Sequence, residues 1–481
     1  MQKRRAPGPE AGQAVKKPGY SIDMVNGPLA GKLLLFALPL MLSSLLQLLF
    51  NAADVVVVGR YAGKEALAAV GSNGSLINLL VNLFIGFSVG ANVVVARDLG
   101  AGREEDVGKS VHTSVTLSLI SGVVLMAAGT ILARQLLVWT ASPAEVIGLA
   151  TVYLRIYFCG MPANMLYNFG AAILRAQGDT RRPLYFLSIA GVTNVALNLL
   201  FVIVLEMSVA GVALATIISQ YISAALVLRC LMGDQGALRL DLRALGLDKR
   251  VVRRILQVGL PAGFQGIVFS LSNVVIQSSI NSFNSTVIVA GSSASANIEG
   301  FVYASMNAFY QTALTFTSQN YGAGQCKRVD RTLFLCQAYV VITGLVLGNL
   351  AVFFGPTLAG IYAPGQQAVI AQAVLRLKYV CSLYCICGIM DTMVGILRGL
   401  GYSVVPMVVS MIGACGTRLL WVATIFRANP TPALLYLSYP VSWTITAVVH
   451  ILFFLFIRGH AYAKVKGIHG VDAEEKLAGQ A

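Results

Sequence analysis

Long apolar runs recur along the chain, and they limit its possible folds more than any other feature of the sequence. One of them, PLYFLSIAGVTNVALNLLFVIVL, covers residues 183–205. A helix needs about 20 mostly apolar residues to cross the hydrocarbon core of a bilayer. The expected spans lie near residues 33–58, 66–95, 110–133, 146–173, 183–205, 208–231, 253–281, 287–318, 332–354, 370–397, 404–426 and 431–457. We therefore expect an all-α integral membrane protein with about twelve transmembrane helices.

The distribution of basic residues predicts how these spans are oriented. Only 11% of the 481 residues are charged, against roughly 25% in a soluble domain, and the net charge is +15. Lys and Arg gather in both ends of the chain and in every second loop, whereas the opposite loops hold little beyond Arg60, Lys64, Arg134 and Arg427. The positive-inside rule then places both termini in the cytoplasm. We attribute the positive charge to this topology and to contact with anionic lipids, and we expect no nucleic-acid partner.

Residue types that carry enzyme chemistry are few and scattered. Of the eight cysteines, Cys381, Cys385 and Cys387 cluster, but they lie in an apolar span and form no CxxC pair. The four histidines are far apart, and neither a zinc spacing nor a phosphate-binding loop is present. The sequence therefore predicts neither an enzyme nor a resident metal or cofactor.

The second half of the chain repeats the first. Leu38-Pro39 returns as Leu260-Pro261, and the LR, G and P of LRAQGDTRRP (residues 174–183) return in LRGLGYSVVP (residues 397–406), with shifts of 222 and 223 residues. Each half holds six expected spans, so both halves enter the membrane from the same side and form a parallel repeat, as in transporters whose two lobes rock around a central site. The predicted segments are a disordered cytoplasmic tail (1–32), an N-terminal lobe (33–231), a cytoplasmic linker (232–252), a C-terminal lobe (253–458) and a cytoplasmic tail (459–481).

Polar residues form stripes on several helices of the first half. Residues three and four apart share a helix face, so Ser43, Gln47, Asn51 and Asp54 line one side of the first span. Similar pairs are Asn164 and Asn168, Asn194 and Asn198, and Thr216 and Gln220. A carboxylate in hydrocarbon costs roughly 2.5–3.5 kcal/mol or more, so we expect the stripes to face one another. Asp54, Asn198 and Thr216 lie at similar depths and are expected to converge, whereas Asn168 lies deeper and fits less well. A pocket of oxygen atoms with one carboxylate suits Na⁺ or a proton.

These segments resemble a known family. The stretch LPLMLSSLLQLLFNAADVVVVGRYAG, the loop GAGREEDVGK, LRAQGDTRRP, NVALNLLFVI and, in the second half, YGAGQCKRVDR and LRGLGYSVVP resemble the multidrug and toxic compound extrusion (MATE) family over about residues 28–457. The resemblance implies a monomeric antiporter in the plasma membrane of a prokaryote. It implies export of small amphipathic, cationic compounds in exchange for inward Na⁺ or H⁺, without a cofactor.

The resemblance also implies roles for particular residues. Asp54 matches an acidic residue of the family's first span, and Asn194, Asn198 and Thr216 fall on coupling-ion positions. Many relatives have Asp at the position of Asn198, which leaves the choice between Na⁺ and H⁺ open. Further candidates for a polar cavity are Gln47, Asn51, Asn168, Gln220, Glu299 and Asp391. Asp391 is the repeat partner of Asn168 and matches an acid on the tenth span of relatives.

Other interpretations of the same residues remain open. Asp54 also fits an ordinary acid at a helix end, and the asparagines fit hydrogen bonds that hold helices together. Asp391 also fits a structural pair with a basic residue. A lipid-linked-sugar flippase of the same superfamily is the alternative function, since Arg155, Arg376, Lys378 and Arg418 lie near or within spans.

Overall fold

The computed structural model describes residues 19–139 and 145–478 and contains helices and turns, without a strand, over these ranges. Residues 1–18 of the predicted N-terminal tail lie outside them. The helices of the first half are α1 (Leu29–Val57), α2 (Lys64–Gly100), α3 (Glu104–Trp139), α4 (Ile147–Cys159), α5 (Met161–Ala176), α6 (Arg181–Asn198) and α7 (Ser208–Met232). The π-helical segments η1 (Val58–Ala62) and η2 (Leu199–Val204) continue α1 and α6.

The second half repeats this order of helices. A single 3₁₀ turn, η3 (Leu242–Ala244), lies in the connection between the halves. The helices are α8 (Lys249–Asn281), α9 (Thr286–Gly322), α10 (Cys326–Phe353), α11 (Gly355–Tyr362), α12 (Gln367–Val380), α13 (Tyr384–Gly399), α14 (Val404–Ser410), α15 (Thr417–Trp421) and α16 (Pro432–Ala478), with π-helical segments η4 (Met411–Gly416) and η5 (Val422–Phe426). The helix α16 therefore extends through residues 459–478, where the sequence predicted a tail.

Each of the twelve predicted spans corresponds to helix, so the predicted fold class is confirmed. Within the described ranges, nine helices are individually long and apolar enough to cross a membrane. The pair Gln367–Val380 and Tyr384–Gly399, bent by 48°, adds a tenth. The other two expected spans are α9 and the short pair α4 and α5, which are broken at Gly160. The twelve predicted spans thus exceed these ten because the span of α4 and α5 is broken and because α9 contains many polar residues.

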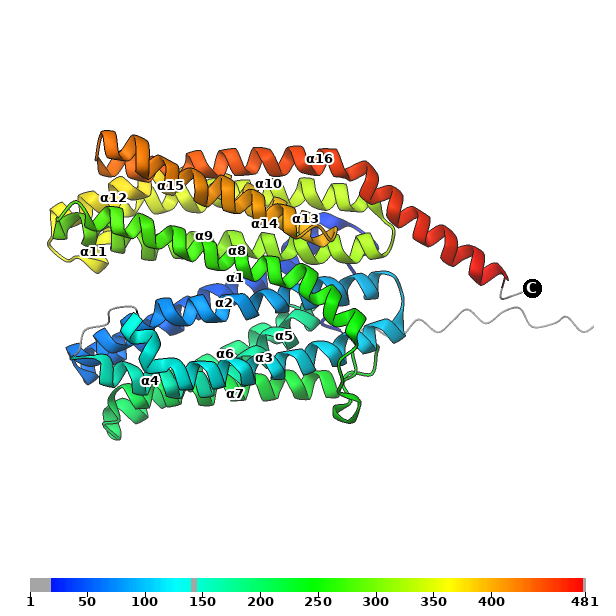
Figure 1. Ribbon diagram of the computed structural model, residues 1–481, viewed down its shortest axis with the longest axis horizontal. Helices are drawn as coiled ribbons and strands as arrows, with labels where there is room; N and C mark the ends of the chain where they lie inside the picture. The colour runs from blue at the N-terminus through cyan, green and yellow to red at the C-terminus, as the bar shows by residue number, and fades with distance from the viewer. Residues whose placement is uncertain (1–18, 140–144, 479–481) are drawn as a thin grey trace, which may run out of the picture.

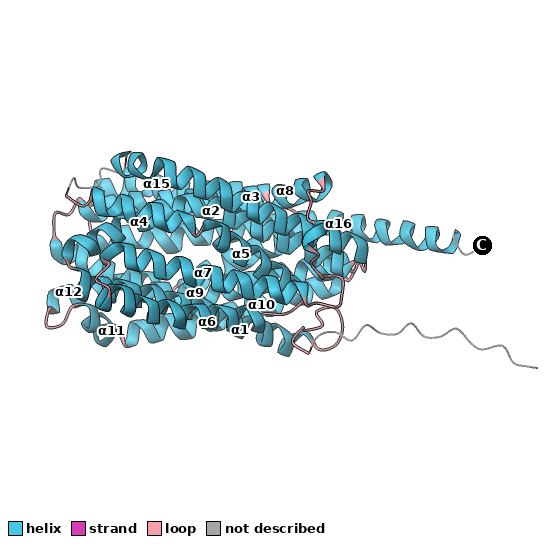
Figure 2. Cartoon of the chain, turned by 90° about the horizontal axis from the view of Figure 1, so that it is seen from below, coloured by secondary structure: helices cyan, strands magenta, loops and turns pink. Residues whose placement is uncertain are grey.

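The helices form two groups that lie side by side. In Figure 1, α2 to α7 make up the lower group and α9 to α16 the upper group, and Figure 2 shows the helices running along one common axis. The first half of α1 crosses to the second group, where the ring of Phe36 packs edge-on against Phe316 of α9, with centroids 5.3 Å apart. Pro39 follows this contact inside α1. The later part of α1 returns to its own group and packs on α6.

Glycines allow α2 and α8 to touch backbone to backbone across the two groups. A Cβ atom on Gly86 would collide with the backbone of Gly263, and one on Gly259 would lie 2.7 Å from the Cα atom of Phe87. Polar contacts continue the seam toward one end of the bundle. The Thr315 hydroxyl donates to the Asn92 amide oxygen over 3.0 Å. At that end Arg97 donates to the backbone oxygen of Gly399 over 3.0 Å. The two halves are therefore closed against each other at the end that carries residues 97–103.

Candidate functional site

A cavity of about 120 Å³ lies inside the first group of helices, and we call it the Asp54 cavity. Its polar lining comes from α1 (Gln47, Asn51, Asp54), α5 (Asn164, Asn168), α6 (Asn194) and α7 (Thr216, Ser219, Gln220, Ser223). These are the faces on which the sequence showed polar stripes. Four helices thus turn their polar sides toward one another and away from lipid, which lacks hydrogen-bond partners for them.

A chain of hydrogen bonds joins the four predicted coupling residues. Asn198 donates its side-chain amide to a carboxylate oxygen of Asp54. The same amide lies 3.3 Å from the side-chain oxygen of Asn194. Asn194 in turn donates to the Thr216 hydroxyl over 3.4 Å. The structure therefore places Asp54, Asn194, Asn198 and Thr216 in one network, and residues 144 positions apart in sequence become direct partners.

The local helix geometry explains how this network forms. Asn194 and Asn198 are buried, one turn apart near the end of α6, and η2 begins directly after Asn198. Asp54 is half-buried and lies in the last turn of α1, just before η1. Short π-helical segments inside helices often occur at functional sites. In this protein η1 follows Asp54 and η2 follows Asn198, the two residues whose side chains meet.

The remaining first-half candidates line the same cavity at its edge. Gln47 and Asn51 are exposed on α1, two turns and one turn before Asp54 respectively. The Asn168 amide donates to the side-chain oxygen of Asn164 over 3.0 Å. The Gln220 side-chain oxygen is buried without a hydrogen-bond partner. The Asn198 side-chain oxygen is also buried without a hydrogen-bond partner, and it belongs to the side chain that contacts the Asp54 carboxylate.

This set of donor atoms suits a weakly held hard cation better than a resident metal. Within the described residues, no group of three His, Cys, Asp or Glu side chains has the geometry of a metal site. The Asp54 cavity offers one carboxylate with amide and hydroxyl oxygens, and its lining includes no Lys or Arg among the described residues. Hard cations prefer such oxygen ligands, and a lone carboxylate can also take up a proton.

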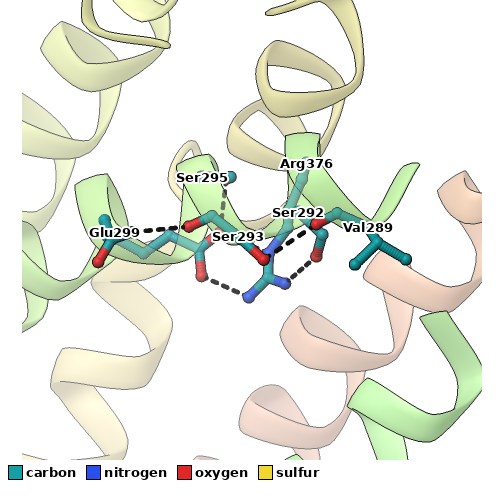
Figure 3. Close-up of polar contacts among 7 residues, drawn as sticks. Val289, Ser292, Ser293, Ser295, Glu299 and Arg376 are labelled. Atoms are coloured by element: carbon teal, nitrogen blue, oxygen red, sulfur yellow. Dashed lines mark hydrogen bonds and ion pairs between the residues drawn. The ribbon is translucent and has the colours of Figure 1, made fainter. Parts of the chain in front are cut away.

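The two candidate acids of the second half, Glu299 and Asp391, occupy different environments, and neither lies in the Asp54 cavity. Glu299 of α9 is buried and forms a two-pronged ion pair with Arg376 of α12, at 2.7 and 2.9 Å. Figure 3 shows that Ser292 and Ser295 complete this cluster: Arg376 donates to Ser292, and Ser295 donates to Glu299 over 2.8 Å. The carboxylate and the guanidinium group thus neutralise each other, and the ion pair links α9 to α12.

Asp391 lines another cavity, of about 200 Å³, which we call the Asp391 cavity. Its walls come from α2 of the first half and from α8, α9 and α13 of the second. Arg398, which the sequence indicated as part of the repeated LRGLG motif and as a basic residue seven positions after Asp391, also lines it. The hydrogen bonds by which Gln265 and Tyr310 hold this arginine in place could not be predicted, because those residues belong to other helices.

Comparison with known proteins places this architecture in a family. The sequence model of the MatE family matches twice, over residues 39–200 and 261–422, so the matched segments follow the internal repeat. The chain is 26% identical over 432 residues to the probable multidrug resistance protein YoeA of Bacillus subtilis, covering 88% of this chain and 93% of that protein. It is 28% identical over 396 residues to the probable multidrug resistance protein YpnP of the same organism, covering 81% and 87%.

Solved structures agree with the sequence comparison. A crystal structure of MATE in the bent conformation superposes with a TM-score of 0.84 at 20% identity, covering 92% of this chain and 98% of that one. At this identity the likeness concerns the fold. Together with the two family matches, which cover well over half of the chain, it shows that this multi-pass membrane protein belongs to the MatE family.

Proposed function

We propose that the chain exports small amphipathic, cationic compounds across the cell membrane in exchange for inward Na⁺ or H⁺, and that the incoming cation binds at Asp54. The observation that carries this proposal is the hydrogen-bonded network of Asp54, Asn198, Asn194 and Thr216 in a cavity inside one lobe. The names of YoeA and YpnP, both multidrug resistance proteins, support export of toxic compounds. Both termini are proposed to be cytoplasmic, on the basis of the basic loops.

A cation at Asp54 competes with the amide of Asn198 for the same carboxylate. When Na⁺ or a proton arrives, it weakens the hydrogen bond from Asn198 to Asp54, which is one of the contacts between α6 and α1. The closed seam between α2 and α8 gives the lobes a second contact that must open for alternating access. Cation binding at α1, which contacts both groups of helices, is therefore well placed to bias the movement of one lobe against the other.

Efflux from proteoliposomes under separate gradients tests this function. The purified protein is reconstituted with a fluorescent organic cation, ethidium, and given an inward Na⁺ gradient, an inward pH gradient or neither. We expect one of the two gradients to accelerate ethidium export. Equal export under all three conditions would refute the antiport mechanism.

The flippase alternative depends on basic residues along the transport path. Arg376 is buried and paired with Glu299. Arg418 donates to Ser442 and lies over the Tyr439 ring at 4.4 Å. These two guanidinium groups are thus engaged by protein partners. Movement of a fluorescent lipid-linked sugar in the same proteoliposomes without an ion gradient would favour the flippase.

A further inference from the structure

A charged pocket of about 360 Å³ lies at the closed end of the bundle, and we call it the basic pocket. We propose that it binds a phosphate group, and that an anionic phospholipid supplies this group. The inference is independent of the coupling ion and of the exported compound. The charged side chains that line the pocket are Arg97, Arg103, Arg254, Lys464 and Asp98.

The one acid of this lining cannot neutralise all the basic residues, because each of its oxygens already accepts a hydrogen bond. Asp98 is buried, and one carboxylate oxygen accepts from Arg254 while the other accepts from the Ser110 hydroxyl over 2.7 Å. Among the described residues that line the pocket, four basic side chains stand against one acid, which leaves three positive charges in excess. A phosphate group supplies negative charge and several oxygen acceptors in a single ligand.

The guanidinium group of Arg97 is held in place by the protein and keeps donors for a ligand. One terminal nitrogen donates to the backbone oxygen of Gly399 over 3.0 Å, and the group lies over the Tyr321 ring, 5.0 Å from its centroid. Gly401 has a φ of +97°, and a Cβ atom there would lie 3.0 Å from the same nitrogen. Since a guanidinium group has five N–H donors in a planar fork, the remaining donors match the oxygens of a phosphate.

The repeat shows that the positive charge belongs to this pocket and not to both halves alike. The repeat partner of Arg97 is Gln319, which donates to the backbone oxygen of Ala176 over 3.4 Å. This bond is the counterpart of the bond from Arg97 to Gly399, because residues 176 and 399 are also repeat partners. Gln319 lines a different pocket, whose charged lining is Asp23, Glu104, Asp234 and Arg182. Equivalent places in the two halves therefore carry opposite net charge.

The helices beside the basic pocket favour a lipid as the source of the phosphate. Helices α8, α14 and α16 pack on one another, and each carries an apolar side chain that is exposed near the pocket. Leu260 lies three residues after Gln257 of the lining, Val404 lies two residues after Tyr402, and Phe456 lies eight residues before Lys464. Acyl chains can pack on such residues while the headgroup enters the pocket, as in basic lipid sites between transmembrane helices.

The basic pocket is shared by the two halves of the chain. Arg97 and Arg103 belong to the first half, whereas Arg254 of α8 and Lys464 of α16 belong to the second. The Tyr321 hydroxyl donates to the backbone oxygen of Ala461 over 3.1 Å, one turn before Lys464. A phosphate bound here therefore bridges the halves at their closed end, and it loses part of its site when this end opens.

Native mass spectrometry of the purified, delipidated protein in detergent tests the inference, because it resolves each bound lipid. The probes are dioleoylphosphatidylglycerol, which is anionic, and dioleoylphosphatidylcholine, which has the same chains and a phosphate but no net charge. We expect the first phosphatidylglycerol to bind about tenfold or more tightly than the first phosphatidylcholine, since each nearby basic residue contributes about fivefold. Equal affinities for the two lipids would overturn the inference.

Substitutions assign the bound lipid to the basic pocket. Lys464→Gln changes an exposed side chain and is expected to weaken the first phosphatidylglycerol about fivefold, and Arg97→Gln at least as much. The matched controls are Lys249→Gln and Arg243→Gln, which remove exposed basic residues outside the lining and are expected to change nothing. If the controls weaken binding as much as the pocket variants, the lipid is held by general surface charge and the inference is wrong. Should Arg97→Gln fail to fold, Lys464→Gln and its control still decide.

A soluble probe separates a lipid from a free phosphate ester. Glycerophosphoglycerol has the headgroup and phosphate of phosphatidylglycerol but no acyl chains. We expect it to bind at least tenfold more weakly than the lipid, because it cannot use the apolar residues beside the pocket. If it binds as tightly as the lipid and displaces it, the phosphate site stands but the assignment to a lipid is wrong. No ion gradient enters these measurements, so their outcome does not depend on the antiport mechanism.

Discussion

Removing the carboxylate of Glu299 is predicted to destabilise the second lobe strongly. Glu299 and Arg376 are 6% and 7% exposed, and each carboxylate oxygen accepts a hydrogen bond from the guanidinium group. The substitution Glu299→Gln keeps the volume but leaves Arg376 charged and buried without its counter-ion. Breaking one partner of a buried ion pair costs about 3–5 kcal/mol. We expect a loss of that order in the free energy of unfolding.

Unfolding in mixed detergent and SDS micelles, followed by far-UV circular dichroism, measures this change. The matched control is Glu105→Gln, which removes an exposed carboxylate paired with Lys109 and is expected to leave stability unchanged. The double variant Glu299→Leu with Arg376→Met replaces both charges by apolar groups, and it is expected to lose far less than Glu299→Gln because no charge is left buried. A Glu299→Gln protein within about 0.5 kcal/mol of the wild type would refute the structural role assigned to this ion pair.

Three further predictions concern the seam, the topology and the ion. Gly86→Ala is expected to disturb the α2–α8 contact and to cost about 1–3 kcal/mol through overpacking, whereas Gly31→Ala, with nothing within 4 Å of the new Cβ, is expected to cost nothing; SDS unfolding compares them. A cysteine at Leu242, which is 51% exposed, in a Cys159→Ser background is expected to resist an impermeant maleimide added outside intact cells, and labelling would contradict a cytoplasmic linker. Asn198→Asp adds a second acid beside Asp54 and is expected to change the dependence of efflux on Na⁺ and pH, so identical ion profiles would count against the network as the cation site.

Hydropathy and periodicity predicted much of the fold because the bilayer imposes simple rules. Every span must be helical and about 20 residues long, so apolar runs marked the helices, although α16 continues about 20 residues beyond its predicted end at residue 457. The shift of 222 residues between Pro39 and Pro261 returned in the structure as two long helices, α1 and α8, that each contain one of these prolines. The spacing of Gln47, Asn51 and Asp54 placed them on one helix face, which the Asp54 cavity confirms geometrically. Their function stays a prediction.

What the sequence did not predict depends on contacts between distant helices. Glu299 and Arg376 are 77 residues apart, and only the packing of α9 on α12 makes them partners. The break between α12 and α13 occurs at residues 381–383, which contain neither proline nor glycine. The contacts of Arg398 with Gln265 and Tyr310 likewise depend on the packing of α8 and α9 against α13.

The substitution Asp54→Asn tests the central claim most directly. It preserves the shape of the side chain and removes the carboxylate to which Asn198 donates, and it eases membrane insertion, because an intramembrane charge is lost. Asp330→Asn, which removes an acid paired with Arg458 outside both cavities, serves as the control. The measurement is ethidium efflux from proteoliposomes under the gradient that drives the wild type, at matched protein content. We predict that Asp54→Asn loses gradient-driven efflux while Asp330→Asn retains it; efflux by Asp54→Asn at the wild-type rate would show that the carboxylate is an ordinary helix-end acid.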